Sequence, residues 1–209
     1  MYSLTSTPSN VQPSVNVCPT DTVDVVVRGN DKRFLMPMRW GLIPGWWKKP
    51  LKEMRVATFN ARSDTIATKP MFRDSFQRRR CLMPASGYYE WVTAPDKSKH
   101  PFYFTRADGE VMTIAAIQDG WLNPEGELIR SCAMVIGEPS KFVSEVHDRM
   151  PVILEPKDFE QWERGDVKDA AALMKPAGEE VLQKWPVLQR VNSSKADKDD
   201  TTLIALDRR

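Results

Sequence analysis

A glutamate lies inside an aromatic segment of this sequence, Gly87-Tyr88-Tyr89-Glu90-Trp91. Burial among aromatic rings disfavours a charged carboxylate and raises its pKa toward the range that suits a general acid. A glutamate in a sheet more commonly pairs with an arginine, so a purely structural role stays open. The segment therefore makes Glu90 a candidate for proton transfer.

A histidine with charged neighbours is the second candidate. His147 is followed by Asp148 and Arg149, and Pro151 closes the segment. A rigidly held imidazole flanked by charges suits acid–base chemistry near neutral pH, although a single histidine is more often structural. The other histidine, His100, lies beside a charged turn, so His147 is the better candidate.

Two groups of residues could bind nucleic acid. Asn60 and Arg62 lie two apart on an extended segment and project from the same side. There an amide and a guanidinium suit a phosphate or sugar oxygen. Trp46 and Trp47 lie in a loop rich in glycine and proline, ahead of several lysines. Exposed indoles beside lysines are typical of a platform on which unpaired bases stack, although one indole could equally plug the core.

Composition narrows the class of protein. The chain has 209 residues, 41% of them hydrophobic, and a net charge of +2. No apolar run approaches the roughly 20 residues that cross a bilayer, and the start lacks the pattern of a secretory signal. We therefore expect a cytoplasmic protein, nucleoid-associated if it is bacterial, with no membrane partner. The three cysteines form no ligand pattern with the two histidines, so we expect free thiols and neither a metal site nor a cofactor.

The pattern of short elements favours an α+β fold with a mostly antiparallel sheet. Runs bounded by turn residues predict strands over 21–28, 34–40, 80–83, 87–92, 102–105, 111–119, 129–136 and 202–206. The strands over 102–105 and 111–119 are expected to form a hairpin around Ala107-Asp108-Gly109. Helices are expected over 65–79, 156–164 and 166–174. The sequence contains no linker or repeat, which favours a single domain.

Several motifs resemble, in order and spacing, the SOS-response-associated peptidase (SRAP) family. They are Trp-Gly-Leu-Ile-Pro-Gly-Trp-Trp at 40–47, Asn-Ala-Arg-Ser-Asp-Thr at 60–65, the segment 76–91, Pro-Phe-Tyr-Phe at 101–104 and His-Asp-Arg-Met-Pro at 147–151. A segment at 16–20 also resembles the family, with Cys18 where alanine is common. The resemblance runs from about residue 16 to the last predicted strand. It implies one SRAP-like domain over 1–209, a mostly antiparallel curved sheet or open barrel with short helices around it.

Members of this family are known to sense and shield abasic sites in single-stranded DNA. The resemblance implies that an N-terminal cysteine forms a thiazolidine with the aldehyde of the abasic sugar and so crosslinks protein to DNA. It assigns catalytic roles to Asn60, which holds the lesion, to Glu90, which assists sugar ring opening, and to His147, which moves protons at the sugar hydroxyl and phosphate. It implies a monomer without a cofactor. It places DNA contacts at Arg62, Arg149, Trp46, Trp47, Pro19 and Met71.

The sequence departs from the family at its start, where Tyr2 stands in place of the cysteine. The amine and thiol of a thiazolidine come from one terminal residue, so neither Met1 nor the internal Cys18 can replace it. We expect the segment 1–15 to be incomplete relative to the family. Two alternatives stay open: a paralogue that binds single strands or junctions without crosslinking, and a cysteine-type peptidase that cleaves its own leader. An enzymatic activity is therefore conditional on the missing nucleophile.

Overall fold

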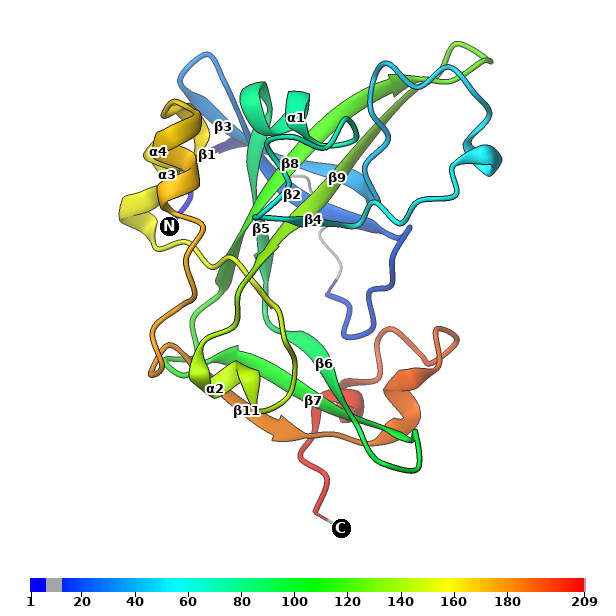
Figure 1. The fold of residues 1–209 in the computed structure, drawn as a ribbon, viewed down its shortest axis with the longest axis vertical. Helices are drawn as coiled ribbons and strands as arrows, with labels where there is room; N and C mark the ends of the chain where they lie inside the picture. The colour runs from blue at the N-terminus through cyan, green and yellow to red at the C-terminus, as the bar shows by residue number, and fades with distance from the viewer. Residues whose placement is uncertain (7–12, 209) are drawn as a thin grey trace.

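The computed structural model describes residues 1–6 and 13–208 and is built around a closed barrel (Figure 1). Its five strands follow the order β3-β2-β5-β8-β9; β3 and β9 close the ring in parallel, and the other neighbours are antiparallel. The expectation of an α+β fold with a mostly antiparallel curved sheet or open barrel is confirmed, and the pairing of β3 with β9 closes the ring. The five strands are β2 (Thr22–Gly29), β3 (Lys32–Trp40), β5 (Arg80–Ala85), β8 (Met112–Leu122) and β9 (Leu128–Gly137).

Three short strands extend the barrel. β1 (Leu4–Ser6) lies parallel to β3, β4 (Asn60–Arg62) lies parallel to β9, and β10 (Met150–Pro151) pairs antiparallel with β9. Arg62 and Pro151 both take Ile136 of β9 as their register partner. The strand β9 therefore brings together two segments that are far apart in the sequence.

A second, smaller sheet carries Glu90. It consists of β6 (Tyr88–Thr93), β7 (Lys99–Arg106) and β11 (Leu182–Pro186), antiparallel in the order β11-β7-β6. In Figure 1 this sheet lies below the barrel. Tyr88 stacks on its cross-strand partner Phe104, with ring centroids 4.9 Å apart.

The helices are short and lie around the barrel and the small sheet. Where the chain is described, the α-helices are α1 (Arg73–Arg78), α2 (Lys141–Ser144), α3 (Phe159–Arg164) and α4 (Val167–Ala172), and the 3-10 helices are η1 (Leu51–Glu53), η2 (Pro156–Asp158), η3 (Gln189–Asn192) and η4 (Thr201–Ile204). Asp166 caps α4 through hydrogen bonds from two backbone N–H groups and completes a capping box with Asp169. None of the described helices has the length and apolar character that a membrane crossing requires.

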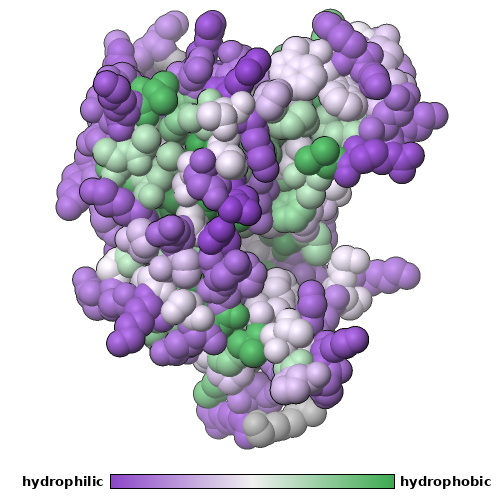
Figure 2. All heavy atoms as spheres, in the orientation of Figure 1, coloured by the Kyte–Doolittle hydropathy of each residue, from purple (hydrophilic) through white to green (hydrophobic). Residues whose placement is uncertain are grey.

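The two larger of three hydrophobic clusters among the described residues hold these parts together. One joins the barrel to the helices and contains Phe76, Phe159 and Trp162. The other joins the barrel to the small sheet and contains Met38 and Phe104. Each large side chain buried in this way stabilises the fold by roughly 1.5–3 kcal/mol. Figure 2 shows that polar residues cover most of one face, which is hollowed between the barrel and the small sheet.

Three sequence-based expectations are wrong. The segments 102–105 and 111–119 do not form a hairpin, because β7 pairs with β6 and β11 whereas β8 pairs with β5 and β9. The turn between them carries the chain from one sheet to the other. The segment 202–206 is not a strand, since Thr201–Ile204 is a 3-10 helix and only Leu206 makes an isolated bridge, to Val187. Within 65–79 the α-helix covers only Arg73–Arg78 and is preceded by turns.

Candidate functional site

Glu90 and His147 meet although they come from different parts of the fold. Glu90 lies on β6, and its carboxylate is 3.7 Å from Nε2 of His147. The Glu90 side chain is 20% exposed. Burial raises its pKa from 4.5 to about 7, against the opposing effect of His147. We call Glu90 and His147 the acid–base pair, since a carboxyl with this pKa exchanges protons at neutral pH.

The position of His147 is set by the helix that precedes it. The backbone N–H of His147 donates to the carbonyl of Val143 at 3.0 Å, which continues the turn of α2. Ser140 caps the start of α2, and the Glu179 carboxylate accepts hydrogen bonds from the first two N–H groups of the helix. Lys184 of β11 donates to the carbonyl of Phe142 at 2.7 Å. These contacts fasten α2 to the small sheet, so both members of the acid–base pair are held by one substructure.

The imidazole of His147 has a defined orientation. Its Nδ1 lies 3.1 Å from the backbone nitrogen of Arg149, whose N–H donates to it. When Nδ1 is the acceptor, Nε2 carries the proton and faces the carboxylate of Glu90. In the protonated ring Nδ1 can instead donate to the Arg149 carbonyl, 3.2 Å away. The ring therefore has a partner in both protonation states.

A small pocket is lined by two arginines, one of which, Arg149, donates its backbone N–H to this histidine. Its cavity of about 130 Å³ is bounded by Arg62 of β4, Arg149, and carboxylates that include Asp64 and Glu138. Arg62 pairs with Asp64 at 2.5 Å, and its side chain is 48% exposed. We call this cavity the arginine pocket. Two guanidinium groups at one opening suit a phosphate oxygen. To bind it, Arg62 would have to exchange its contact with Asp64 for the phosphate.

The acid–base pair and the arginine pocket belong to one electrostatic environment. Asp148, between His147 and Arg149 in the sequence, is 3.5 Å from Nδ1 of His147. Burial is the main cause of the raised pKa of Glu90 and the hydrogen bond to Asp64 is the main cause of the raised pKa of Arg62; the negative charge of Asp148 adds to both shifts. The sequence-predicted residues Glu90, His147, Arg62 and Arg149 are thus brought together.

Asn60 lies on the same side of β4 as Arg62, with buried Ala61 between them. Its Oδ1 is buried and has no hydrogen-bond partner. Within the described residues, no hydrogen bond or ion pair joins Asn60 to Glu90 or His147. An unpaired buried acceptor carries a desolvation cost of about 1–3 kcal/mol, which a ligand donor would relieve.

The two tryptophans occupy the loop 41–47, called the tryptophan loop below. Trp46 is 47% exposed and Trp47 is half-buried, with ring centroids 6.1 Å apart. One of the two indoles therefore reaches the surface, as a stacking platform requires. Lys48 and Lys49, which follow directly, are also exposed.

The two remaining predicted contacts, Pro19 and Met71, are not part of the acid–base pair or of the lining of the arginine pocket. Pro19 is exposed in the turn before β2, next to Thr20, whose N–H donates to the Trp40 carbonyl at 2.7 Å. Met71 is half-buried and packs against the core between the barrel and the helices. This packing explains the position of Met71 without DNA.

The cysteines offer no reactive thiol. All three are free; Cys81 and Cys132 are buried and Cys18 is half-buried. Burial and the neighbouring Asp21 charge raise the pKa of the Cys18 thiol, which lowers its reactivity. Among the described residues, no group of three or more histidine, cysteine or acidic side chains could hold a metal ion.

Asp119, a carboxylate that is only 6% exposed and contacts the tryptophan loop, was not among the residues predicted from the sequence. The signal was present, because Asp119 interrupts the apolar run Met112–Leu122. A charged side chain in a buried strand is rare unless it is paired.

The fold and the site together define a class: a small barrel with an attached sheet that presents a carboxyl–imidazole pair beside an arginine-lined pocket. The match to a family model is more specific. The chain belongs to the SOS response associated peptidase (SRAP) family, whose model matches residues 2–194. The resemblance found in the motifs is therefore confirmed.

Similar curated proteins share one name, abasic site processing protein. YoqW of Bacillus subtilis is 30% identical over 186 residues, covering 88% of this chain and 82% of YoqW. YedK of Escherichia coli is 32% identical over 157 residues, covering 75% and 67%. HMCES of Xenopus tropicalis is 32% identical over 215 residues, covering 88% and 64%.

Solved structures show the same fold. A protein of Bacteroides thetaiotaomicron matches with a TM-score of 0.81 at 24% identity, over 90% of this chain and 82% of its own. A protein of Bordetella bronchiseptica matches with a TM-score of 0.77 at 26% identity, over 86% and 90%.

Proposed function

We propose that this protein binds single-stranded DNA at abasic sites and acts on the abasic sugar through Glu90 and His147. The observation that carries the proposal is the contact of His147 with a glutamate whose pKa is raised to about 7. The names of the relatives supply the substrate class, since YoqW, YedK and HMCES are abasic site processing proteins.

The chemistry of an abasic sugar fits this pair. Opening the ring removes a proton from the C1 hydroxyl and delivers one to the ring oxygen, which exposes the aldehyde. A carboxyl with a pKa near 7 gives and accepts protons with similar ease at neutral pH. We propose that Glu90 moves the proton and that His147, whose Nε2 faces the Glu90 carboxylate, orients that carboxylate. Asn60 holds the sugar with its unpaired Oδ1. Arg62 and Arg149 bind flanking phosphates, and Trp46 stacks on a base.

A covalent step needs a further group. A thiazolidine forms from the amine and the thiol of one terminal cysteine, and Met1 and Tyr2 supply no thiol. The side chain of Tyr2 is engaged elsewhere: its hydroxyl lies 2.6 Å from Thr113 Oγ1 and its ring stacks on Phe159. We propose that a cysteine placed at the start of the chain would crosslink, and that residues 13–208 supply the binding and proton-transfer groups.

The test compares single-stranded DNA that carries one abasic site with the same DNA carrying an intact base. Binding is measured by fluorescence anisotropy, and covalent products by denaturing gel. We expect tighter binding to abasic DNA, and a heat-stable adduct from a variant that starts Met-Cys. Equal affinity for the two DNAs, without an adduct from that variant, would overturn the proposal.

The variant Asn60→Ala tests whether Asn60 contributes to binding of the lesion without contributing to the stability of the fold. Removing a buried unpaired acceptor should leave the melting temperature unchanged or higher, because a desolvation cost disappears. Affinity for abasic DNA should fall about tenfold, as expected for one lost hydrogen bond to a ligand. Wild-type affinity and adduct yield in this variant would remove Asn60 from the site.

A further inference from the structure

Two polar side chains on neighbouring strands of the barrel hold the backbone of the tryptophan loop. Ser131 Oγ of β9 accepts a hydrogen bond from the Ile43 N–H at 2.8 Å. Asp119 Oδ2 of β8 accepts one from the Gly45 N–H at 3.0 Å. Because Asp119 and Ser131 are cross-strand partners, they project from the same face of the barrel.

A third side chain on this face continues the pattern. Trp121 lies two residues beyond Asp119 on β8, and its Nε1 donates to the carbonyl of Trp47 at 2.6 Å. The three side chains therefore hold alternate residues of the loop. We call Ser131, Asp119 and Trp121 the loop clasp.

Asp119 is the centre of the clasp. Its side chain is 8% exposed and also accepts hydrogen bonds from Ser75 Oγ at 3.3 Å, from the Arg79 guanidinium at 3.1 Å and from the Gly120 N–H at 2.8 Å. Every partner is a donor. An asparagine here would turn its own NH2 group toward at least one of these donors, so only a carboxylate satisfies them all.

The loop approaches the clasp too closely for any other residue at position 45. A Cβ added to Gly45 would lie 2.8 Å from the Gly120 carbonyl oxygen and 3.3 Å from Oδ1 of Asp119. Backbone atoms cannot yield at such a distance, so a side chain at position 45 would lift the loop away from β8.

The directly neighbouring indole is the exposed one. Trp46 lies between the clasped residues Gly45 and Trp47 and is 47% exposed. Because the backbone is held on both sides of Trp46, the direction of the indole ring is fixed while the ring stays exposed. A platform for base stacking gains affinity from such preorganisation, because binding then orders fewer groups.

We propose that Asp119, with Ser131 and Trp121, is a positioning residue that holds the tryptophan loop in the shape that stacks on unpaired DNA bases. This inference rests on the proposed single-strand binding of the same site. Asp119 touches no DNA; it acts through the backbone of Gly45.

The test uses the full chain and a single-stranded oligothymidylate carrying one abasic site. Four variants are compared with the wild type: Asp119→Asn, Gly45→Ala, Trp46→Ala and the matched control Asp74→Asn. Asp74 also pairs with Arg79 but has a side chain that is 45% exposed. Affinity, DNA-induced quenching of tryptophan fluorescence and the melting temperature are measured for each.

Asp119→Asn and Gly45→Ala should each bind DNA about tenfold more weakly, as expected when one hydrogen bond of a preorganised site is lost, and should lose most of the quenching at temperatures where they are fully folded. Asp74→Asn should match the wild type. Gly45→Ala leaves the ion pair between Asp119 and Arg79 intact. This variant therefore still tests the inference if Asp119→Asn does not fold. The inference would be overturned, and the proposed function left standing, if Trp46→Ala binds more weakly while Asp119→Asn and Gly45→Ala bind and quench like the wild type. Wild-type binding by Trp46→Ala would overturn the stacking role and the inference with it.

Discussion

Because Glu90 is buried, its protonation affects the free energy of unfolding as well as the proposed proton transfer. In the folded protein its pKa is raised from 4.5 to about 7. Between these two values the folded state keeps a proton that the unfolded chain has released. The stabilisation is therefore complete below about pH 4.5 and is lost as the pH rises through 7.

Glu90→Gln should remove this dependence. The wild-type free energy of unfolding should fall by about 3 kcal/mol more than that of the variant between pH 4.5 and pH 8, because each pKa unit corresponds to about 1.4 kcal/mol. Urea unfolding of both proteins across this range measures the difference. The variant should also open the abasic sugar more slowly, and its rate should not show the fall above pH 7 that we expect of the wild type. Parallel stability profiles of the two proteins would show that Glu90 titrates normally.

Individual residue types and their neighbours predicted part of this site. The aromatic neighbours of Glu90 predicted its raised pKa, because burial by adjacent residues is a local property of the sequence. The contact with His147 could be expected only from the family resemblance, since it depends on α2 packing against the small sheet. The unpaired Oδ1 of Asn60 has no sequence signal at all.

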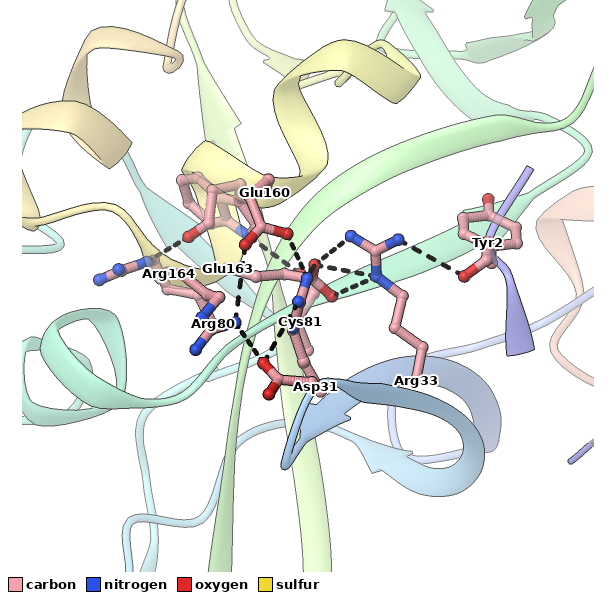
Figure 3. A network of polar contacts seen from close by, with 10 residues as sticks. Tyr2, Asp31, Arg33, Arg80, Cys81, Glu160, Glu163 and Arg164 are labelled. Atoms are coloured by element: carbon pink, nitrogen blue, oxygen red, sulfur yellow. Dashed lines mark hydrogen bonds and ion pairs between the residues drawn. The ribbon is translucent and has the colours of Figure 1, made fainter. Parts of the chain in front are cut away.

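At the scale of elements, α3 is fastened to the β2–β3 hairpin by a group of ion pairs (Figure 3). The Glu163 side chain is 1% exposed and accepts hydrogen bonds from Arg33 at 2.5–3.1 Å, with Arg28 3.7 Å away. Arg33 also reaches the carbonyl of Tyr2, and Arg164 pairs with Asp31. The network thus ties the start of the chain, the hairpin and α3 to one another.

Glu163→Ala should destabilise the fold by about 3–5 kcal/mol, because it leaves the half-buried guanidinium of Arg33 without its carboxylate partner. Glu160→Ala is the matched control on the same helix: Glu160 also pairs with Arg28, but its side chain is 61% exposed, so its loss should cost at most about 1 kcal/mol. Thermal unfolding measures both. Affinity for abasic DNA should be unchanged in each variant below its melting temperature. A similar loss of stability in the two variants would mean that burial does not distinguish the two pairs.

The elements were predictable where the signal is local. β2, β3, β8 and β9 show apolar runs between turn residues, and these strands are found close to their expected ranges. The predicted turn around Asp108 does form, since Asp108 accepts hydrogen bonds from Arg106 and from the Glu110 N–H. The predicted hairpin is wrong because the strands on either side of this turn pair in different sheets. β11 escaped prediction since its strand conformation depends on pairing with β7.

For the whole molecule, the sequence carries a net charge of only +2, so its total charge gives little attraction to DNA. The proposed binding depends instead on where the charges lie. Arg62 and Arg149 share one pocket, and Lys48 and Lys49 follow the tryptophan loop. If a few arginines and lysines at defined positions contact the phosphates, the salt dependence of the DNA affinity should be proportional to the number of these contacts and not to the net charge.

The dependence of DNA affinity on salt should therefore identify which cations touch phosphates. A plot of the logarithm of the binding constant against the logarithm of salt concentration should lose about 0.7 of slope in Arg62→Gln and again in Arg149→Gln, the contribution of one phosphate contact with single-stranded DNA. Arg164→Gln changes the net charge by the same amount, but this arginine is 53% exposed and pairs with Asp31 beside α3, so its slope should equal that of the wild type. If Arg164→Gln flattens the plot as much as the two pocket variants, the attraction is general and the arginine pocket is not where the DNA backbone lies. If only the pocket variants flatten it, the phosphates flanking the lesion lie beside the histidine that is proposed to act on the sugar.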